Sequence, residues 1–146
     1  METATKTISK KPKIKLDFKD SKYATGRRKK SIAKIWVKKG TGKIYVNGRT
    51  MEDYFTSGAH KMQITRPFEI IKQATSYDVR CSVAGGGHTG QAGAMVHGIA
   101  KALILIDEEN RAVLKTEKLN TRDSRSVERK KPGRRKARRS FQFSKR

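Results

Sequence analysis

The sequence predicts one folded domain that contains both strands and helices and is flanked by two strongly basic arms. The chain has 146 residues, the usual size of a single domain, and 34% of them are hydrophobic. Residues 1–30 hold 11 basic and 3 acidic side chains, residues 31–120 hold 13 and 8, and residues 121–146 hold 12 and 2. Because blocks of like charge stay unfolded until a partner orders them, we expect a folded centre with extended basic N- and C-terminal arms.

The net charge of +23 predicts a polyanionic partner, because a compact protein of that charge repels itself. The single cysteine, Cys81, cannot form an internal disulfide or a Cys-x-x-Cys metal pair. The three histidines show no ligand spacing, so we expect no metal and no cofactor. No apolar run approaches the ~18 residues of a membrane span, so we expect no membrane partner.

Two short strands are expected first along the centre. Residues 31–48, with the sequence SIAKIWVKKGTGKIYVNG, are rich in Ile, Trp, Val and Tyr. Gly40-Thr41-Gly42 divides this run, which predicts a hairpin of two strands. Asn47-Gly48 predicts a second turn at the end of the run.

Two helices are expected next. Thr50 followed by Asp53 predicts an N-cap for a brief helix with the sequence MEDYF. Pro67 suits the first turn of another helix, PFEIIKQA, which we expect to end near Ser76.

The second half of the centre predicts a strand, a glycine-rich loop and two helical segments. The run YDVRCSVA alternates apolar and polar residues, so we expect a strand in which the Cys81 thiol is buried. Apolar residues then recur in steps of three and four from Ala92 to Ile106, which predicts one amphipathic helix. Its remaining positions include small residues that allow close packing on a sheet. Acidic residues from Asp107 suit the N-terminus of a second helical segment that runs to about Lys115.

The glycine-rich loop, VAGGGHTGQAG, raises the question of a nucleotide-binding enzyme, because Gly85, Gly87 and Gly90 have the spacing G-x-G-x-x-G. A dinucleotide-binding unit needs a second strand after the helix, and the helical period here continues unbroken to Ile106. A phosphate-binding P-loop needs Lys and Ser or Thr where Gln91 and Ala92 stand. We therefore expect no enzyme and no small-molecule substrate.

The same loop can still bind phosphate. Glycines at a helix N-terminus expose backbone N–H groups, and an RNA phosphate can accept from them. The alternative, that the glycines only form a tight turn and pack closely, stays open. His88 can point to RNA from this loop, whereas His60 and His97 are expected at the surface or in packing contacts.

The tail is the most basic segment. From Arg129 to Arg146 there are ten basic residues and no acid, so we expect an extended path that becomes ordered on RNA. Phe141 and Phe143 lie on one side of an extended chain, where they stack on bases or, as we favour, anchor the tail in a crevice. The segment TGRRKKS is expected to be a loop that offers a second phosphate clamp through Arg27, Arg28, Lys29 and Lys30.

Three stretches resemble one known family. YATGRRKKSIAKIWVKKGTGKIYVNGR begins at Tyr23, GGGHTGQAGAMVHGIAKAL begins at Gly85, and TRDSRSVERKKPGRRKARRSFQFSKR begins at Thr121. In this order they resemble ribosomal protein nine of the small subunit, in its bacterial or organellar form. The resemblance implies an α+β fold with a four-stranded mixed sheet, packed helices and a left-handed crossover. It divides the chain into an N-terminal extension (1–22), a core domain (23–120) and a basic tail (121–146).

The resemblance also implies a function. Such a protein is a structural constituent that binds small-subunit rRNA in the head, next to other head proteins, and its tail reaches the peptidyl-site tRNA. The tRNA contact falls on Ser144, Lys145 and Arg146. The rRNA contacts fall on the 27–30 clamp and on residues of the loop and the tail, namely Gly86, Gly87, His88, Thr89, Gln91, Arg122, Arg125, Arg129, Lys130, Lys131, Arg134, Arg135, Lys136, Arg138 and Arg139.

The expected location is the ribosome in the cytoplasm, with the mitochondrial ribosome as the alternative. One rival function remains open at this point. A basic protein that compacts nucleic acid would share the charge and the arms, but it gives no reason for a pair of phenylalanines near a basic carboxyl end.

Overall fold

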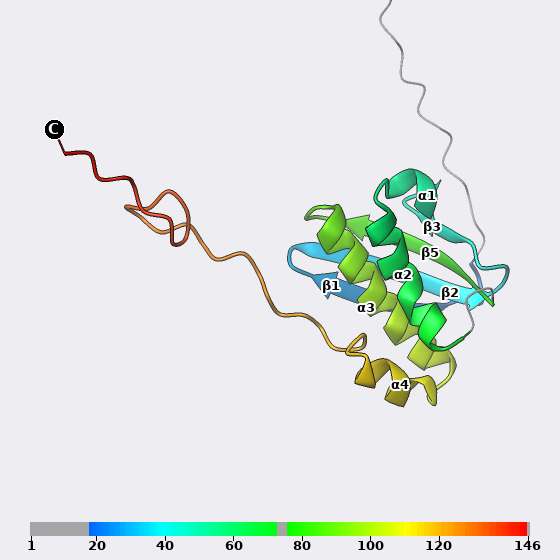
Figure 1. Cartoon of the computed structure of the whole chain (residues 1–146). Helices are drawn as coiled ribbons and strands as arrows, with labels where there is room; N and C mark the ends of the chain where they lie inside the picture. Colours follow the sequence, from blue (N-terminus) through cyan, green and yellow to red (C-terminus); the bar gives the residue numbers. More distant parts are fainter. Residues whose placement is uncertain (1–17, 73–75, 146) are drawn as a thin grey trace, which may run out of the picture.

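The computed structural model describes residues 18–72 and 76–145, and the chain in these ranges forms a sheet packed on one side by helices (Figure 1). The elements, in chain order, are β1 (Lys22–Arg28), β2 (Ser31–Lys39), β3 (Ile44–Val46), β4 (Arg49–Thr50), α1 (Met51–Tyr54), α2 (Gly58–Ile70), β5 (Tyr77–Ala84), α3 (His88–Ile106) and α4 (Asn110–Thr116).

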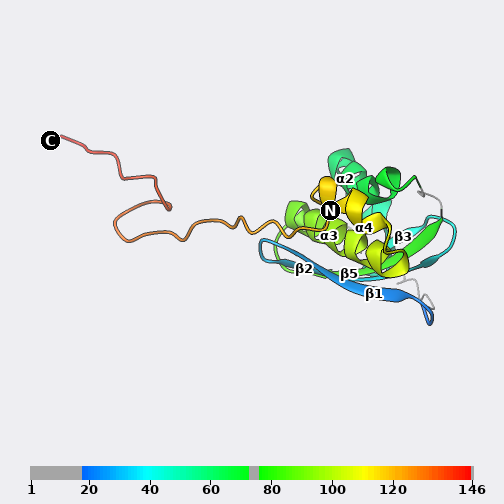
Figure 2. The same cartoon turned by 90° about the horizontal axis from the view of Figure 1, so that it is seen from below.

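The sheet is mixed and has the strand order β1-β2-β5-β3-β4. β1 and β2 pair antiparallel, as do β2 and β5, and β3 and β4, whereas β3 and β5 pair parallel. The α-helices lie together on one face of the sheet, and β1, β2 and β5 form the layer beneath them (Figure 2). This arrangement confirms the α+β fold.

The core lies between the sheet and α3. Along β2 the buried residues alternate with exposed or half-buried ones, so that Ala33, Ile35 and Val37 face the helices. α3 carries 11 buried residues and is the central helix of the core. The buried Cys81 thiol also faces this core, as expected.

α3 lies unusually close to β1. A Cβ atom added at Gly26 of β1 would collide with the backbone of α3, at the Ala94 carbonyl oxygen and the Gly98 nitrogen. A Cβ atom added at Gly98 would in turn lie 2.9 Å from the Gly26 nitrogen and 2.7 Å from Ile35 Cδ1. The expected close packing of the small residues of this helix is therefore confirmed.

The hairpin expected over residues 31–48 is wrong. β2 and β3 are not neighbours, because β5 lies between them. The loop that joins them is held by Asp78 of β5, whose Oδ1 accepts hydrogen bonds from the Thr41 and Lys43 backbone nitrogens at 2.8 and 3.0 Å. Burial would raise the pKa of Asp78, but these backbone hydrogen bonds outweigh it and hold the pKa below its ordinary value.

The sheet has five strands rather than the expected four, because the two residues of β4 also pair. The turn before β4 is the predicted one: Asn47 and Gly48 have φ of 51° and 78°, as a two-residue hairpin turn requires. The connection from β3 to its parallel neighbour β5 runs through β4, α1 and α2. The left-handed sense of this crossover stays a prediction.

Of the first two helices, one agrees with its prediction from the sequence and the other does not. The Thr50 cap is confirmed, because its Oγ1 accepts a hydrogen bond from the Asp53 nitrogen at 3.3 Å. The helix expected to start at Pro67 is wrong, because α2 begins at Gly58 and contains Pro67 near its end. The ring removes one backbone donor, and the helix stops three residues later at Ile70. Residues 73–75 of the expected helix lie outside the described residues.

α3 is one continuous helix to Ile106, as predicted. The strand that a dinucleotide-binding unit would need does not interrupt this segment. Against expectation, the length and composition of α3 alone would let it cross a membrane, although most of it is buried inside the domain. α4 begins at Asn110, three residues later than predicted, because Asp107 ends α3 and Glu108 and Glu109 form a turn.

The two arms meet the domain differently from expectation. Residues 1–17 of the expected extension lie outside the described residues, Phe18 is buried, and Lys22 already belongs to β1. The segment TGRRKKS is a strand end and a turn, not a loop, since Arg27 and Arg28 belong to β1. Residues 121–145 contain no helix or strand and run away from the domain (Figure 1).

We expect Gly26→Ala to lower the free energy of unfolding by about 1–3 kcal/mol, because the methyl group would push α3 away from β1. Gly58→Ala is the matched control. An added Cβ at Gly58 meets nothing within 4 Å, so alanine there should be neutral or slightly stabilising. Urea unfolding followed by the fluorescence of the single tryptophan measures both variants. Equal midpoints for the two variants would contradict the close contact.

Candidate nucleic-acid interface

The β1–β2 turn and the glycine-rich loop lie side by side. Lys29 and Lys30 form the turn, with φ of 52° at Lys29, and both side chains are exposed. The next residue, Ser31, is buried, and its hydroxyl donates a hydrogen bond to the Gly85 carbonyl oxygen at 3.1 Å. Two lysines and the exposed loop at Gly86, Gly87, His88 and Thr89 therefore share one edge of the molecule.

The glycines of the loop have separate roles. Gly85 and Gly86 have φ of 72° and 60°, and a side chain at Gly86 would collide with Ser31. Gly90 packs on Ser31 as well, with an added Cβ only 2.7 Å from its Oγ. These three glycines serve the turn and close packing. Gly87, the N-cap of α3, has nothing within 4 Å of an added Cβ and no side-chain cap, so an anion can approach the backbone there.

His88 packs against two aromatic rings on one side. Its ring lies edge-on to Tyr54 and Phe55, with centroids 5.5 and 5.9 Å apart. The residue is exposed, so it can face RNA while it packs on these rings. As expected, His60 makes local contacts, with Phe55 at 5.9 Å and with the Thr89 hydroxyl at 3.2 Å.

Gln91 holds the loop in place rather than pointing outward. Its Nε2 donates to the Gly85 carbonyl oxygen at 3.1 Å, and its Oε1 accepts from the Tyr54 hydroxyl at 2.9 Å. Both ends of the amide are therefore used inside the protein. This arrangement fixes the path of the exposed residues between Gly85 and Gln91.

The root of the tail is fixed to the same edge through Asp123. Arg28 lies against Gly93 of α3 and is half-buried, and its Nη2 is 3.4 Å from Asp123 Oδ2. Arg125 donates to the same carboxylate from Nε at 3.0 Å and from Nη2 at 2.8 Å. These hydrogen bonds, and then the charge of Arg28, hold the pKa of Asp123 well below its ordinary value. The β1–β2 turn, the start of α3 and the tail root thus converge.

His97 of α3 lies beneath this junction. Its Nδ1 accepts a hydrogen bond from the Arg27 backbone nitrogen at 3.3 Å. As the acceptor, the His97 Nδ1 atom carries no proton. Burial lowers the pKa of His97, and the charges of Lys101 and Arg122 lower it further. His97 is thus a packing residue, as expected, and Arg27 leaves its side chain exposed.

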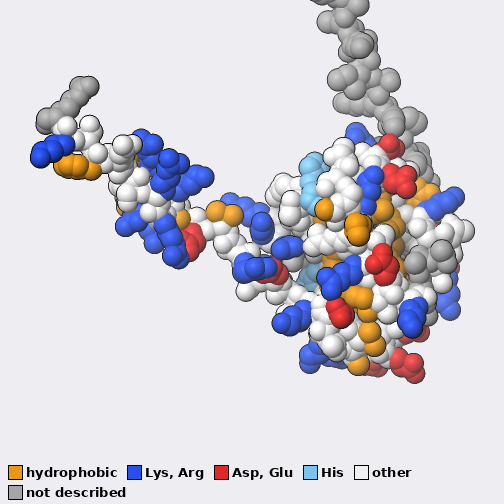
Figure 3. All heavy atoms as spheres, viewed as in Figure 1, with side chains coloured by type: hydrophobic (Ala, Val, Ile, Leu, Met, Phe, Trp, Pro, Cys, Tyr) orange, Lys and Arg blue, Asp and Glu red, His pale blue; other side chains and the backbone are white. Residues whose placement is uncertain are grey.

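The tail beyond the root folds back on itself once. Arg138 donates to both oxygens of Glu128, at 2.7 and 3.0 Å, and the Arg135 nitrogen donates to the Arg139 carbonyl oxygen at 2.9 Å. The Arg135 guanidinium lies 5.3 Å from the centre of the Phe141 ring. With only two acids in the tail, most of its cations remain for a partner, and lysines and arginines cover it (Figure 3).

The remaining predicted tail residues are exposed, and all except Arg122, which lies at the root near His97, lie away from the domain. These are Arg122, Arg129, Lys130, Lys131, Arg134, Lys136, Ser144 and Lys145. Phe141 is 61% and Phe143 87% exposed, so neither ring is anchored on the domain. Arg146 lies outside the described residues.

Sequence reasoning missed Asp123 and Ser31, which organise this edge. Asp123 stands in the sequence TRDSR between Arg122 and Arg125, so an acid flanked by arginines was the available signal. Ser31 had no such signal, because its role depends on the glycine loop 54 residues away.

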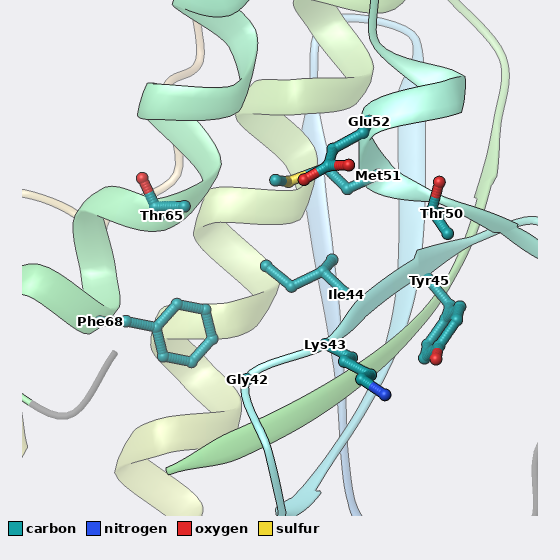
Figure 4. Close-up of a pocket in the computed structure, with 9 residues that line it drawn as sticks. All are labelled: Gly42, Lys43, Ile44, Tyr45, Thr50, Met51, Glu52, Thr65 and Phe68. Atoms are coloured by element: carbon teal, nitrogen blue, oxygen red, sulfur yellow. The ribbon is translucent and has the colours of Figure 1, made fainter. Parts of the chain in front are cut away.

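A hollow of about 450 Å³ lies elsewhere, between β3, α1 and α2. Figure 4 shows Ile44 and Phe68 at its walls, with Tyr45 on the other side of β3. None of the predicted RNA-binding residues lines it. Among the described residues, no group of three or more His, Cys, Asp or Glu side chains is arranged to hold a metal ion.

One known family matches the segments that form this turn, loop and tail. The chain matches the family described as ribosomal protein S9/S16 over residues 26–146, which include the β1–β2 turn, the glycine-rich loop and the whole tail. The match spans far more than half of the chain. The chain therefore belongs to the ribosomal protein S9/S16 family and is a protein of the small ribosomal subunit.

Proposed function

We propose that this chain is a structural constituent of the small subunit that binds rRNA in the head and reaches the peptidyl-site tRNA with its tail. Family membership supports the first part, and it places the protein in the ribosome among structural rather than enzymatic proteins. The observation that carries the proposal is the convergence of three segments. Arg28 contacts Gly93 near the start of α3 and Asp123 at the tail root, next to the Lys29-Lys30 turn.

The rRNA contacts divide into a rigid part and an adaptable part. The rigid part is the edge formed by Lys29, Lys30 and the loop around Gly87, where the backbone is fixed by Ser31 and Gln91. The adaptable part is the tail, whose arginines bind two phosphate oxygens at once and stack on bases. Arg28 positions the root through Asp123, so its role in RNA binding is indirect, whereas the exposed Arg125 can exchange Asp123 for a phosphate.

The tail end is the proposed tRNA contact. Ser144 and Lys145 are exposed at the far end of the tail, and Arg146 follows them. The two cations would donate charge-assisted hydrogen bonds to phosphates of the anticodon stem-loop, while Ser144 adds a hydroxyl contact. Their contribution should be modest, about 1–2 kcal/mol in total. Phe141 and Phe143 would hold the segment before the tip in a crevice of rRNA or of a neighbouring head protein.

We expect RNA binding to weaken steeply with salt, because each phosphate contact adds about 0.7–0.9 to the slope of log K against log salt. Replacing Lys29→Asn and Lys30→Gln together should reduce that slope by about 1.5, since asparagine tolerates the positive φ of Lys29. Arg111→Gln with Lys115→Gln, on exposed positions of α4, is the matched control and should leave the slope unchanged. Equal slopes in the two variants would remove the turn from the interface.

The same binding titrations, carried out with duplex DNA, distinguish the proposed rRNA-binding function from the alternative of a protein that compacts nucleic acid. At equal salt, an rRNA fragment from the head should bind more tightly than duplex DNA of the same length. Equal affinities would favour the compacting protein.

We expect deletion of Lys145 and Arg146 to leave small subunits assembled but to weaken peptidyl-site tRNA binding, because the tip acts on tRNA and not on rRNA. The replacement of both residues by glutamine keeps the length and should have the same effect. Deletion of everything after Gly133 should impair assembly as well, since it removes Arg134, Arg135, Lys136, Arg138 and Arg139. Filter binding of tRNA to purified subunits and reading-frame reporters measure these effects. Wild-type tRNA affinity after the two-residue deletion would show that the tip is inert.

A further inference from the structure

The face of the sheet opposite the helices carries aromatic and cationic side chains. Figure 2 shows α2, α3 and α4 on one side of the sheet formed by β1, β2 and β5, with no helix on the opposite side. On this outer face two apolar side chains are substantially exposed, Tyr23 at 46% and Ile32 at 41%. None of the residues so far assigned to RNA binding, except Arg27, belongs to this face.

Aromatic and cationic side chains form one row across the strands of this face. The pairing places Tyr23 beside Trp36, Trp36 beside Arg80, and Arg80 beside Tyr45. The Tyr23 and Trp36 rings are 5.2 Å apart and tilted at 45°, and the Arg80 guanidinium lies 5.3 Å from the Trp36 ring. Tyr45 lies on the opposite side of β3 from Ile44 (Figure 4). Four neighbouring strands thus present three rings and a planar cation together.

The charges around this row favour an anion. Arg27 and Lys34 are exposed on the outer face, alternating with the residues that point to the core. Lys38 and Arg80 also lie on this face, where Lys38 is 4.9 Å from the centre of the Phe18 ring and Arg80 contacts Trp36. The only carboxylate at these outer positions of the four strands is Asp78, and it is occupied by hydrogen bonds from Thr41 and Lys43. The face is therefore a set of aromatic rings surrounded by cations.

We propose that this sheet face binds an unpaired segment of RNA, with a base stacked at Tyr23 and Trp36 and the adjacent phosphates held by Lys34 and Arg27. The inference rests on the proposed function, because it adds a second rRNA contact to the edge and the tail. Unpaired RNA fits better than a duplex, because in a duplex the bases are stacked on each other and cannot reach the rings. An apolar protein partner is disfavoured, because the exposed cations Arg27 and Lys34 would lose their hydration against it.

The first experiment uses Trp36, which is the only tryptophan of the chain. The full-length protein is titrated with ten-nucleotide oligouridine, with duplex RNA of equal length, and with heparin, which has the charge of RNA but no bases. Oligouridine should quench the tryptophan fluorescence, and duplex RNA and heparin should bind without comparable quenching. Equal quenching by heparin, or binding of oligouridine without quenching, would overturn the proposal while RNA binding through the edge and tail still stands.

Variants then locate the contact. Tyr23→Leu should weaken oligouridine binding about tenfold, the effect typical of one stacked base. Lys34→Gln should weaken it less and flatten the salt dependence, whereas Lys115→Gln on α4 is the matched control and should change nothing. Circular dichroism checks that each variant is folded. If Tyr23→Leu and Lys34→Gln both bind as the wild type does, the sheet face is not an RNA site.

The last experiment tests the assembled subunit. A photo-cross-linking Tyr23→p-benzoylphenylalanine variant should cross-link to rRNA. Cross-linking to a protein, or no cross-link, would overturn the proposal for the sheet face. Lys30→p-benzoylphenylalanine serves as the reference for the proposed edge. Failure at both positions would count against the proposed function, whereas failure at position 23 alone would count only against the sheet face.

Discussion

The contact between the backbones of β1 and α3 is the constraint on which the rest of the structure depends. Gly26 and Gly98 let the helix lie directly on the edge strand of the sheet, where any side chain would hold the two apart. Because the helix is so close, Arg28 can lie against Gly93 and still reach Asp123. Ser31 reaches the glycine-rich loop through a separate contact, because the pairing of β2 with β5 places Ile32 beside Ala84 and so brings Ser31 next to Gly85. The position of the tail root therefore depends on two missing side chains, and the edge that we propose to bind phosphate depends on the pairing of β2 with β5 as well.

Elements with a local cause could be predicted from the sequence, and those with a distant cause could not. The α3 helix, β5, the Thr50 cap and the Asn47-Gly48 turn each have a sequence signal within a few residues, although the Asn47 side chain also exchanges two hydrogen bonds with Val83 of β5. The hairpin failed because β5, which comes more than 30 residues later, pairs with both β2 and β3 and separates them, and its Asp78 binds the loop that joins them. β1 was missed because TGRR is basic and contains a glycine, which is a weak strand pattern until α3 packs on it.

The candidate interface shows the same contrast between features with a local cause and features with a distant cause. The sequence identified the basic turn, the glycine-rich loop and the tail, because charge and glycine content are visible in a single chain. The assignment of Arg28, Arg125 and Gln91 to RNA stays a prediction, and the structure adds that their side chains also make contacts within the protein. The sequence also left two roles open for the loop glycines. The structure divides them, since Gly85, Gly86 and Gly90 make the turn and Gly87 alone is open.

The folded-back segment of the tail has a consequence for distance. Arg138 closes a loop on Glu128, ten residues earlier, so that this part of the chain does not contribute its full length. The pair is exposed, and such pairs contribute only about 0–1 kcal/mol, so a nearby phosphate can replace the carboxylate at little cost. Opening the loop would add up to about 30 Å, at roughly 3.3 Å per extended residue. The distance that the tail can span therefore depends on the partner of Arg138: it is shorter when Arg138 binds Glu128 and longer when Arg138 binds a phosphate.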